Sequence, residues 1–334
     1  MSKTLWSNVN HQIHVAYQRG YGKSASERRE MREKEDIRTI AVKSSREVIT
    51  RDCKRFCEFV KERHPEARTV SASREYIREW KDHLLHEKGL RSETVHGYID
   101  HLGVVYGVSG GQFGLGRSAE PVKGRSERSE RDLRDRANEK YSDFSKLAEM
   151  TGLRRSEIGQ IRYDSFYRKE DGYYYLRVTG KGGREQEQRI LHEHDRYVER
   201  CIAERSHERI CSPEQCRNHI NVHADRRDLA QKAYREYKTM CETKEGRISL
   251  FNELKRQYDE RYDRNGSGRT WRDNPDMRIL EKNPESVYKC RGEQKEEFES
   301  QGKSAEFDRL PLLAVSVFHL AHWRCDVTVQ NYMK

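Results

Sequence analysis

The sequence predicts a mainly α fold with one small β-hairpin, an α+β class arranged as two domains. Apolar residues recur every three or four positions along most of the 334 residues, which is typical of the buried face of a helix. One stretch, residues 173–191, is instead rich in β-forming residues on both sides of a glycine turn. A glycine-rich and then polar run at residues 107–131 separates the two domains.

The first half of the chain is predicted to contain a polar arm followed by helices. Residues 1–36 end in a charge run with almost no apolar face, which predicts a solvated helix or mobile arm. Residues 37–108 then carry three helical stripes. Their apolar positions run from Ile40 to Val60, from Tyr76 to Leu85 and from Val95 to Tyr106. We therefore expect a three-helix domain at 37–108 and a linker at 109–132.

The second half, residues 133–334, is predicted to form one domain around a helix-turn-helix corner. A helix carrying Phe144, Leu147 and Met150 is expected to end at Gly152, since glycine readily adopts the left-handed conformation that ends helices. Ser156 and Glu157 suit the first turn of a new helix, with Ile158, Ile161 and Phe166 as its apolar stripe. Arg154 thus lies between one helix end and the positive end of the next, where an anion such as phosphate is favoured.

Further along, a hairpin and several helices are predicted. The hairpin has Lys181 at its tip. The helices cover a region near Tyr197–Ile202, a long one from Asn218 to about Cys241, the very apolar stretch Leu310–Leu320, and a last one that carries Val329 and Tyr332. Residues 242–308 are highly charged, and their role is left open.

Composition points to a polyanionic partner. The 66 basic and 56 acidic residues give a net charge of +10, which favours nucleic acid, with a membrane surface as the weaker alternative. The sequence contains no run of 18 apolar residues and does not start with the apolar core of a secretion signal, so we expect a cytoplasmic, nucleoid-associated protein.

The eight cysteines are expected to be free thiols. Cys211, Cys216, His219 and His223 are residue types that bind zinc, but only two residues separate the cysteine pair from the histidine pair. A zinc finger needs about 12 residues there, so we expect no metal and no cofactor.

Several motifs occur in an order that resembles the tyrosine recombinases, the phage integrase family, and most closely the integrases of phages and conjugative transposons. They are TGLRRSEI, the hairpin lysine in VTGKGG, HADR, and LAH followed by a tyrosine ten residues after the histidine. The resemblance implies that residues 133–334 form the catalytic domain, with residues 242–308 as an insertion, and that residues 37–108 form the core-binding domain. The implied catalytic residues are Arg154, Lys181, His223, Arg226, His322 and Tyr332.

This sequence also departs from the family pattern. Arg155 stands where the family usually has an apolar residue and is left out of the site. Ala321 replaces a glycine, and 96 positions separate Arg226 from His322, more than in compact relatives.

The resemblance implies an enzyme that cleaves and rejoins DNA through a 3′-phosphotyrosyl intermediate and integrates or excises a mobile element. It would act on double-stranded attachment sites as a homotetramer, with accessory directionality or DNA-bending proteins, and without a metal or a membrane. Two alternatives stay open: a type IB topoisomerase-like enzyme, and a non-catalytic DNA-binding regulator on the same scaffold.

Overall fold

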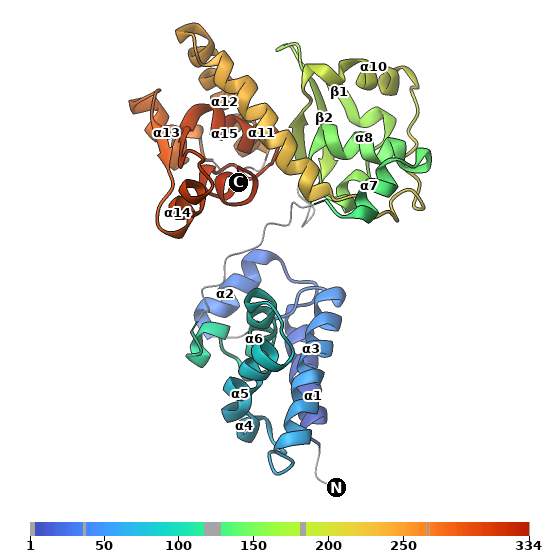
Figure 1. Ribbon diagram of the computed structural model, residues 1–334, viewed down its shortest axis with the longest axis vertical. Helices are drawn as coiled ribbons and strands as arrows, with labels where there is room; N and C mark the ends of the chain where they lie inside the picture. Colours follow the sequence, from blue (N-terminus) through green and yellow to red (C-terminus); the bar gives the residue numbers. More distant parts are fainter. Residues whose placement is uncertain are drawn as a thin grey trace. The chain divides into compact units, whose positions relative to one another are not determined.

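The computed structural model describes residues 4–35, 38–116, 128–180, 185–264, 266 and 268–333. The chain divides into two compact units, Met1–Lys123 and Gly124–Lys334. Figure 1 shows a helical first unit and a second unit in which helices accompany small sheets. The predicted fold class, mainly α with a small β component, is therefore confirmed. None of the helices within these ranges is long and apolar enough to cross a membrane.

The first unit is built from helices around one hydrophobic core. Its elements are α1 (Leu5–Gly20), α2 (Ala25–Glu35), α3 (Lys43–Arg63), α4 (Val70–Ser73), η1 (Arg74–Tyr76), α5 (Ile77–Asp82), η2 (His83–Glu87), α6 (Ser92–Tyr106) and η3 (Gly110–Phe113). The three expected helical stripes correspond to α3, the α4-to-η2 region and α6. Gly107 ends α6 in the left-handed conformation, at φ 70°.

The expectation of a polar arm at residues 1–36 is wrong for its first part. Helix α1 packs against α3 and α6, and it buries Leu5, Val9 and Ile13 in the core of the unit. These residues recur four apart, a helical face that the surrounding polar residues mask in the sequence. Helix α2 matches the expectation better, because it is charged and contributes none of the buried residues recorded for this unit.

The expected linker at 109–132 is ordered at both of its ends. Phe113 and Leu115 pack against the core of the first unit, and Asp132 is fully buried in the second. Residues 117–127, between them, lie outside the described residues.

The second unit begins with helices and a three-stranded sheet around its own core. These elements are α7 (Glu130–Arg136), η4 (Glu139–Tyr141), α8 (Ser142–Thr151), α9 (Arg155–Ile158), η5 (Tyr163–Ser165), β1 (Phe166–Arg168), β2 (Tyr174–Thr179), β3 (Glu185–Arg189), η6 (His192–His194) and α10 (Asp195–Ala203). The antiparallel order is β1-β2-β3, with Phe166 opposite Leu176 and Tyr175 opposite Arg189.

A helix running from Ser156 as far as Phe166 is not found. Helix α9 ends after one turn, and Phe166 starts β1 instead. The backbone after the turn pairs with a distant segment, because the Ile210 N–H donates to the Ile161 carbonyl (3.0 Å) and the Tyr163 N–H to the Glu208 carbonyl (3.2 Å). Tertiary pairing therefore outweighs the helical spacing of the apolar residues.

The rest of the unit forms a larger core around α11 and α15. The elements are α11 (Val222–Met240), α12 (Lys244–Arg264), η7 (Trp271–Asp273), α13 (Pro275–Lys282), β4 (Val287–Lys289), α14 (Glu293–Ser300), β5 (Glu306–Asp308), α15 (Arg309–Phe318) and α16 (Cys325–Tyr332). Helix α11 contacts α8 on one side and α15 on the other, so it runs along the seam between the two cores (Figure 1). Residues 242–308 contribute buried side chains such as Leu250, Trp271 and Phe307 to the larger core.

Candidate functional site

Arg154 is presented by the turn between α8 and α9. Gly152 ends α8 with φ 56°, and a Cβ there would come within 2.9 Å of Leu229, so glycine is needed both for the conformation and for the close approach. Arg154 is the N-cap residue of α9, and its side chain is 38% exposed. The corner predicted from the sequence is therefore present, although the helix that follows it is short.

Glu157, which the sequence motifs do not assign to the site, holds the Arg154 side chain and backbone in place. It is buried, and it accepts hydrogen bonds from the Arg154 backbone N–H (2.9 Å), the Arg154 Nη1 (2.8 Å) and the Gln186 amide (3.0 Å). Burial opposes its charged form, but the hydrogen bonds from Arg154 lower the pKa overall. Its position three residues after the N-cap is the signal that could have found it.

Arg226 lies in α11 at the seam between the two cores and is 1% exposed. Its Nη1 donates to the carbonyl of Gly152 and its Nη2 to the carbonyl of Leu320, so one guanidinium joins the α8–α9 turn to the end of α15. Burial lowers the pKa of Arg226, Tyr332 opposes that shift and the charge of Arg154 adds to it. With these two bonds and a third to the His322 Nε2 (3.5 Å), two of the five N–H donors of the guanidinium remain for a ligand.

The side chains of His322 and Tyr332 lie beside the Arg226 guanidinium. The His322 Nε2 lies 3.3 Å from the Tyr332 hydroxyl and 3.5 Å from the Arg226 Nη2, and the Arg226 guanidinium carbon lies 5.4 Å from the Tyr332 ring centroid. Burial, and then the charges of Arg226 and Arg154, lower the pKa of His322 to about 4. The imidazole is therefore neutral at pH 7. Because a guanidinium can only donate, we assign the Nε2 that faces it as the acceptor nitrogen.

The turn that carries His322 has an unusual backbone. Ala321 and Trp323 both have positive φ, 52° and 62°, which costs energy for residues other than glycine. The His322 N–H donates to the Ser316 carbonyl (3.1 Å), and the buried Ser316 hydroxyl donates to the Arg324 carbonyl (2.9 Å). These bonds hold the turn although the sequence has alanine where glycine was expected.

Residues 242–308 support the same turn. The Trp323 carbonyl accepts from the Tyr258 hydroxyl (3.1 Å) and from the Asn274 amide (3.2 Å). Asp276 accepts from the Cys325 N–H at the start of α16 (3.3 Å). The segment whose role was left open therefore contacts the two elements that carry His322 and Tyr332.

The other two predicted site residues stand apart from this cluster. His223 is the second residue of α11, exposed, and three positions from Arg226; with Arg154 it lines a groove described below. Lys181 lies outside the described residues. The structure thus brings Arg226, His322 and Tyr332 into contact, with Arg154 within electrostatic reach.

Arg155 has a structural role. Its guanidinium donates to the Cys216 carbonyl (3.1 Å), the Asn218 side chain (2.6 Å) and the Ile220 carbonyl (2.5 Å), which fixes the segment before α11. These contacts agree with its exclusion from the site. Within the described ranges, no group of three or more His, Cys, Asp or Glu side chains is arranged to hold a metal ion.

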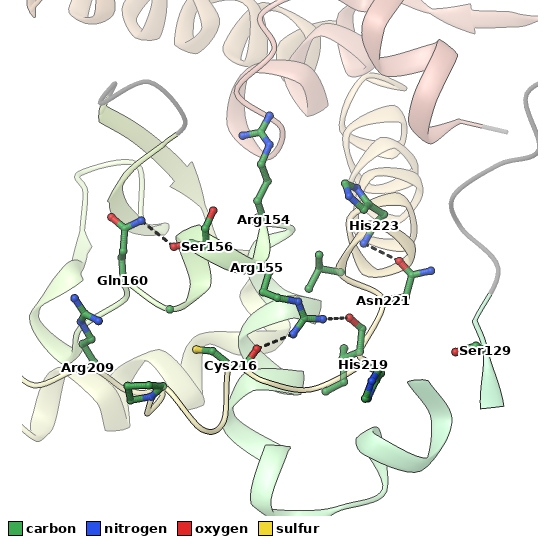
Figure 2. A pocket seen from close by; sticks show the side chains of 14 residues that line it. Ser129, Arg154, Arg155, Ser156, Gln160, Arg209, Cys216, His219, Asn221 and His223 are labelled. Atoms are coloured by element: carbon green, nitrogen blue, oxygen red, sulfur yellow. Dashed lines mark hydrogen bonds between the residues drawn. The ribbon is translucent and has the colours of Figure 1, made fainter. Parts of the chain in front are cut away.

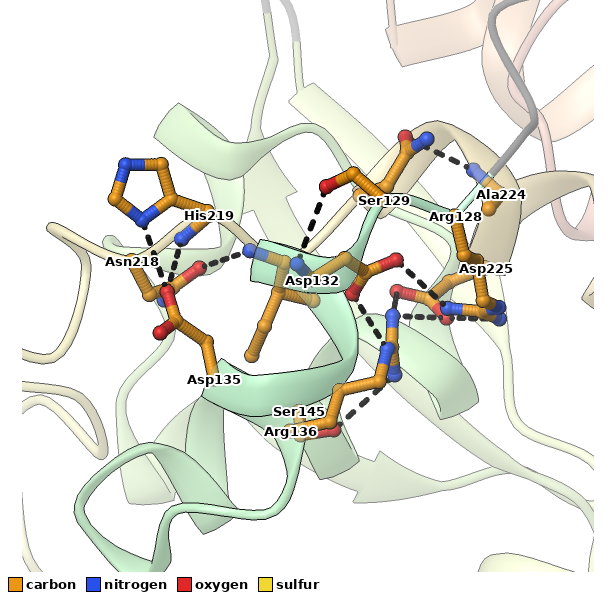
Figure 3. A network of polar contacts seen from close by, with 12 residues as sticks. Arg128, Ser129, Asp132, Asp135, Arg136, Ser145, Asn218, His219, Ala224 and Asp225 are labelled. Atoms are coloured by element: carbon orange, nitrogen blue, oxygen red, sulfur yellow. Dashed lines mark hydrogen bonds and ion pairs between the residues drawn. The ribbon is translucent and has the colours of Figure 1, made fainter.

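A buried ion-pair cluster lies behind the first turn of α11 (Figure 3). Asp225, 1% exposed, pairs with Arg136 (2.6 Å) and Arg128 (2.9 Å), and Arg136 also pairs with Asp132 (2.8 Å). Burial raises the pKa of Asp225, and the two arginines oppose that shift. The cluster joins α7 to the helix that carries His223 and Arg226.

No family model matches the chain, and no curated protein matches it. The solved structures similar to it include XerH site-specific recombinase bound to palindromic difH substrate in a post-cleavage complex, with a TM-score of 0.42 and 14% identity over 70% of this chain and 84% of that chain.

The pre-cleavage complex of XerH with difH gives a TM-score of 0.40 and 14% identity over 70% and 86%, and XerA recombinase gives 0.24 and 13% over 58% and 79%. Likeness at this level concerns the fold alone, so a function must be argued from the residues of the site.

Proposed function

We propose that the chain is a tyrosine-type site-specific DNA recombinase, with Tyr332 as nucleophile. The observation that carries the proposal is the Tyr332 hydroxyl, which lies 3.3 Å from the acceptor nitrogen of a neutral histidine and beside a buried arginine. A tyrosine hydroxyl has a reference pKa of about 10 and needs a base or nearby positive charge to attack. The guanidinium of Arg226 supplies nearby positive charge at Tyr332.

In the proposed reaction, the Tyr332 oxygen attacks a DNA phosphorus atom and the bond from phosphorus to the 5′ oxygen breaks. The hydroxyl gives up its proton as the bond to phosphorus forms, with His223 assisting this proton transfer, and the departing 5′ oxygen takes a proton from Lys181. Arg154 and the remaining N–H groups of Arg226 stabilise the charge on the non-bridging oxygens. The 3′-phosphotyrosyl bond keeps the energy needed for rejoining, and the reverse steps reseal the strand.

At the level of biology, we propose that the enzyme integrates or excises a mobile element. It would act as a homotetramer on pairs of double-stranded attachment sites, with accessory proteins that set direction or bend DNA. The net charge of +10 supports a DNA partner and a place on the nucleoid.

The experiment is a covalent-trapping assay with labelled, nicked duplexes taken from the DNA that surrounds the coding sequence, where an attachment site would lie. The wild type should give a protein–DNA band on a denaturing gel. Tyr332→Phe should fold, bind DNA and give no band, whereas Tyr163→Phe, a matched change at a partly buried tyrosine outside the site, should keep it. A band that survives in Tyr332→Phe refutes the nucleophile.

Two further outcomes separate the alternatives. An enzyme that forms the adduct and relaxes any supercoiled plasmid as a monomer, without exchange between defined sites, would be topoisomerase-like. A chain that binds one sequence tightly and forms no adduct with any DNA would be a regulator.

A further inference from the structure

A groove of about 970 Å³ extends from the site along the surface of the second unit. Arg154 and His223 line it together with residues of α9 and of the segment between α10 and α11, as far as Arg209. Figure 2 shows His223 on one side of the groove, Arg209 and Gln160 on the other, and Arg155 between them. The groove shares Arg154 and His223 with the proposed catalytic set, whereas Arg226, His322 and Tyr332 do not line it.

The charge of the lining is of one sign. Three arginines and two histidines line the groove, and none of its 14 lining residues is an aspartate or glutamate. The smaller pocket beside Arg128 differs in this respect, since Glu149, Glu193, Asp225 and Asp228 line it. In a chain with 56 acidic residues, a groove without a carboxylate is suited to an anion.

Arg209 is the lining residue best placed to bind that anion. Its backbone is fixed, because the flanking Glu208 and Ile210 pair with the Tyr163 and Ile161 backbones. Its side chain is exposed and makes no hydrogen bond or ion pair with another described residue. Arg155, in contrast, is occupied by three acceptors of the protein.

The Ser156 hydroxyl adds a second donor at the groove. It is exposed and has no hydrogen bond to the described part of the chain. A serine hydroxyl and an arginine fork are both common donors to phosphate oxygens, and neither reads base sequence from that position.

We infer that this groove binds the sugar–phosphate backbone of the DNA strand next to the phosphate under attack, with Arg209 contacting a second phosphate and Ser156 one between them. The inference rests on the proposed function in one respect: the statement that the bound DNA backbone is next to the phosphate under attack. The anion-binding character of the groove stands on the lining alone. The segment Cys211 to His223, which contains the cysteine and histidine residues weighed as a zinc site, then forms one wall of the groove that binds the DNA backbone.

The test measures the salt dependence of binding to a 30-base-pair duplex by fluorescence anisotropy between 50 and 200 mM KCl. Losing one phosphate contact lowers the slope of log affinity against log salt by about 0.9. Between 50 and 200 mM, the affinity ratio of wild type to Arg209→Ala should therefore shrink by about threefold. Arg209→Lys should keep the wild-type slope, since a lysine still neutralises the phosphate as a point charge.

Arg217→Ala is the matched control. Arg217 is exposed and lies in the same segment, but it does not line the groove, so its removal takes away the same charge and should leave the slope unchanged. Thermal unfolding should show that both alanine variants fold like the wild type.

The outcomes separate this inference from the proposed function. An unchanged slope in Arg209→Ala, or an equal loss in Arg217→Ala, overturns the groove even if Tyr332 forms a covalent adduct. A reduced slope in Arg209→Ala alone supports the groove even if no DNA ever yields an adduct, in which case the proposed function fails and a backbone-binding groove remains.

Discussion

Tyr258→Phe tests whether residues 242–308 position the turn that carries His322. The change removes one hydroxyl from a side chain that is 1% exposed and keeps its ring, including the edge contact with Trp323 at 4.8 Å between centroids. It abolishes the 3.1 Å bond to the Trp323 carbonyl, while the 3.2 Å bond from Asn274 remains. The carbonyl keeps one donor, so we expect a loss of about 0.5–1.5 kcal/mol in the free energy of unfolding.

The effect on catalysis should exceed that modest loss of stability. Ala321 and Trp323 have positive φ, so the turn relaxes toward other conformations when a support is removed. A 1 Å misplacement at a reacting group can cost about 100-fold in rate, and one lost bond of two should cost roughly tenfold. The assay is the single-turnover rate of adduct formation at saturating protein, with DNA affinity measured beside it and expected to be unchanged.

Tyr174→Phe provides the control for Tyr258→Phe. Tyr174 is also buried and donates a hydroxyl bond of 3.1 Å, to Glu199, but it lies in β2 and packs in the core around α8, whereas Trp323 and α16 pack in the core around α15. It should lose similar stability and keep the wild-type rate. Equal rates for the two variants would refute a positioning role of the segment.

Three further predictions concern the same unit. Ala321→Gly should raise the unfolding free energy by up to about 1 kcal/mol in chemical denaturation, since glycine relieves the strain at φ 52° while giving the unfolded chain more freedom; a destabilised variant would contradict this account of the turn. Lys181→Ala should slow cleavage by roughly 100- to 10,000-fold with DNA affinity retained, and a 5′-sulfur leaving group, which needs little protonation, should restore much of the rate if Lys181 is the acid. The free energy of unfolding should fall as pH drops from 6.5 toward 4. Burial holds the pKa of His322 at about 4 in the folded chain, so in this pH window the unfolded chain binds one more proton than the folded chain. One such proton lowers the free energy of unfolding by about 1.4 kcal/mol for each pH unit. His322→Gln should flatten that part of the denaturation curve, and an unchanged steepness would exclude His322 as its source.

Local chemistry made much of the second unit predictable. The glycine that ends α8, the β-rich hairpin and the long helix before Cys241 follow from patterns over a few neighbouring residues, and all three are found. The family resemblance implies the pair His322 and Tyr332, and the structure places the two side chains in contact. The assignment of catalytic roles stays a prediction.

Other features depend on contacts between distant segments. Helix α9 stops after one turn because its continuation pairs with residues 208–210, and helical spacing alone does not reveal that partner. The burial of α1 depends on α3 and α6, and its polar neighbours hide the apolar face. Tyr258 and Asn274, which support Trp323, lie 65 and 49 positions before it in the sequence, so no local motif encodes these contacts.

The position of Arg226 at the seam of two cores has a mechanical consequence for the proposed intermediate. Arg154 belongs to the core around α8, and Tyr332 to the core around α15, while Arg226 ties the two through Gly152 and Leu320. Once Tyr332 carries the 3′ phosphate and Arg154 holds its oxygens, the DNA strand itself becomes a further tie across the seam. Movement of the two cores apart would then strain the covalent bond. We therefore expect the core around α8 and the core around α15 to resist relative movement most strongly while a strand is attached, and least after the strand is released.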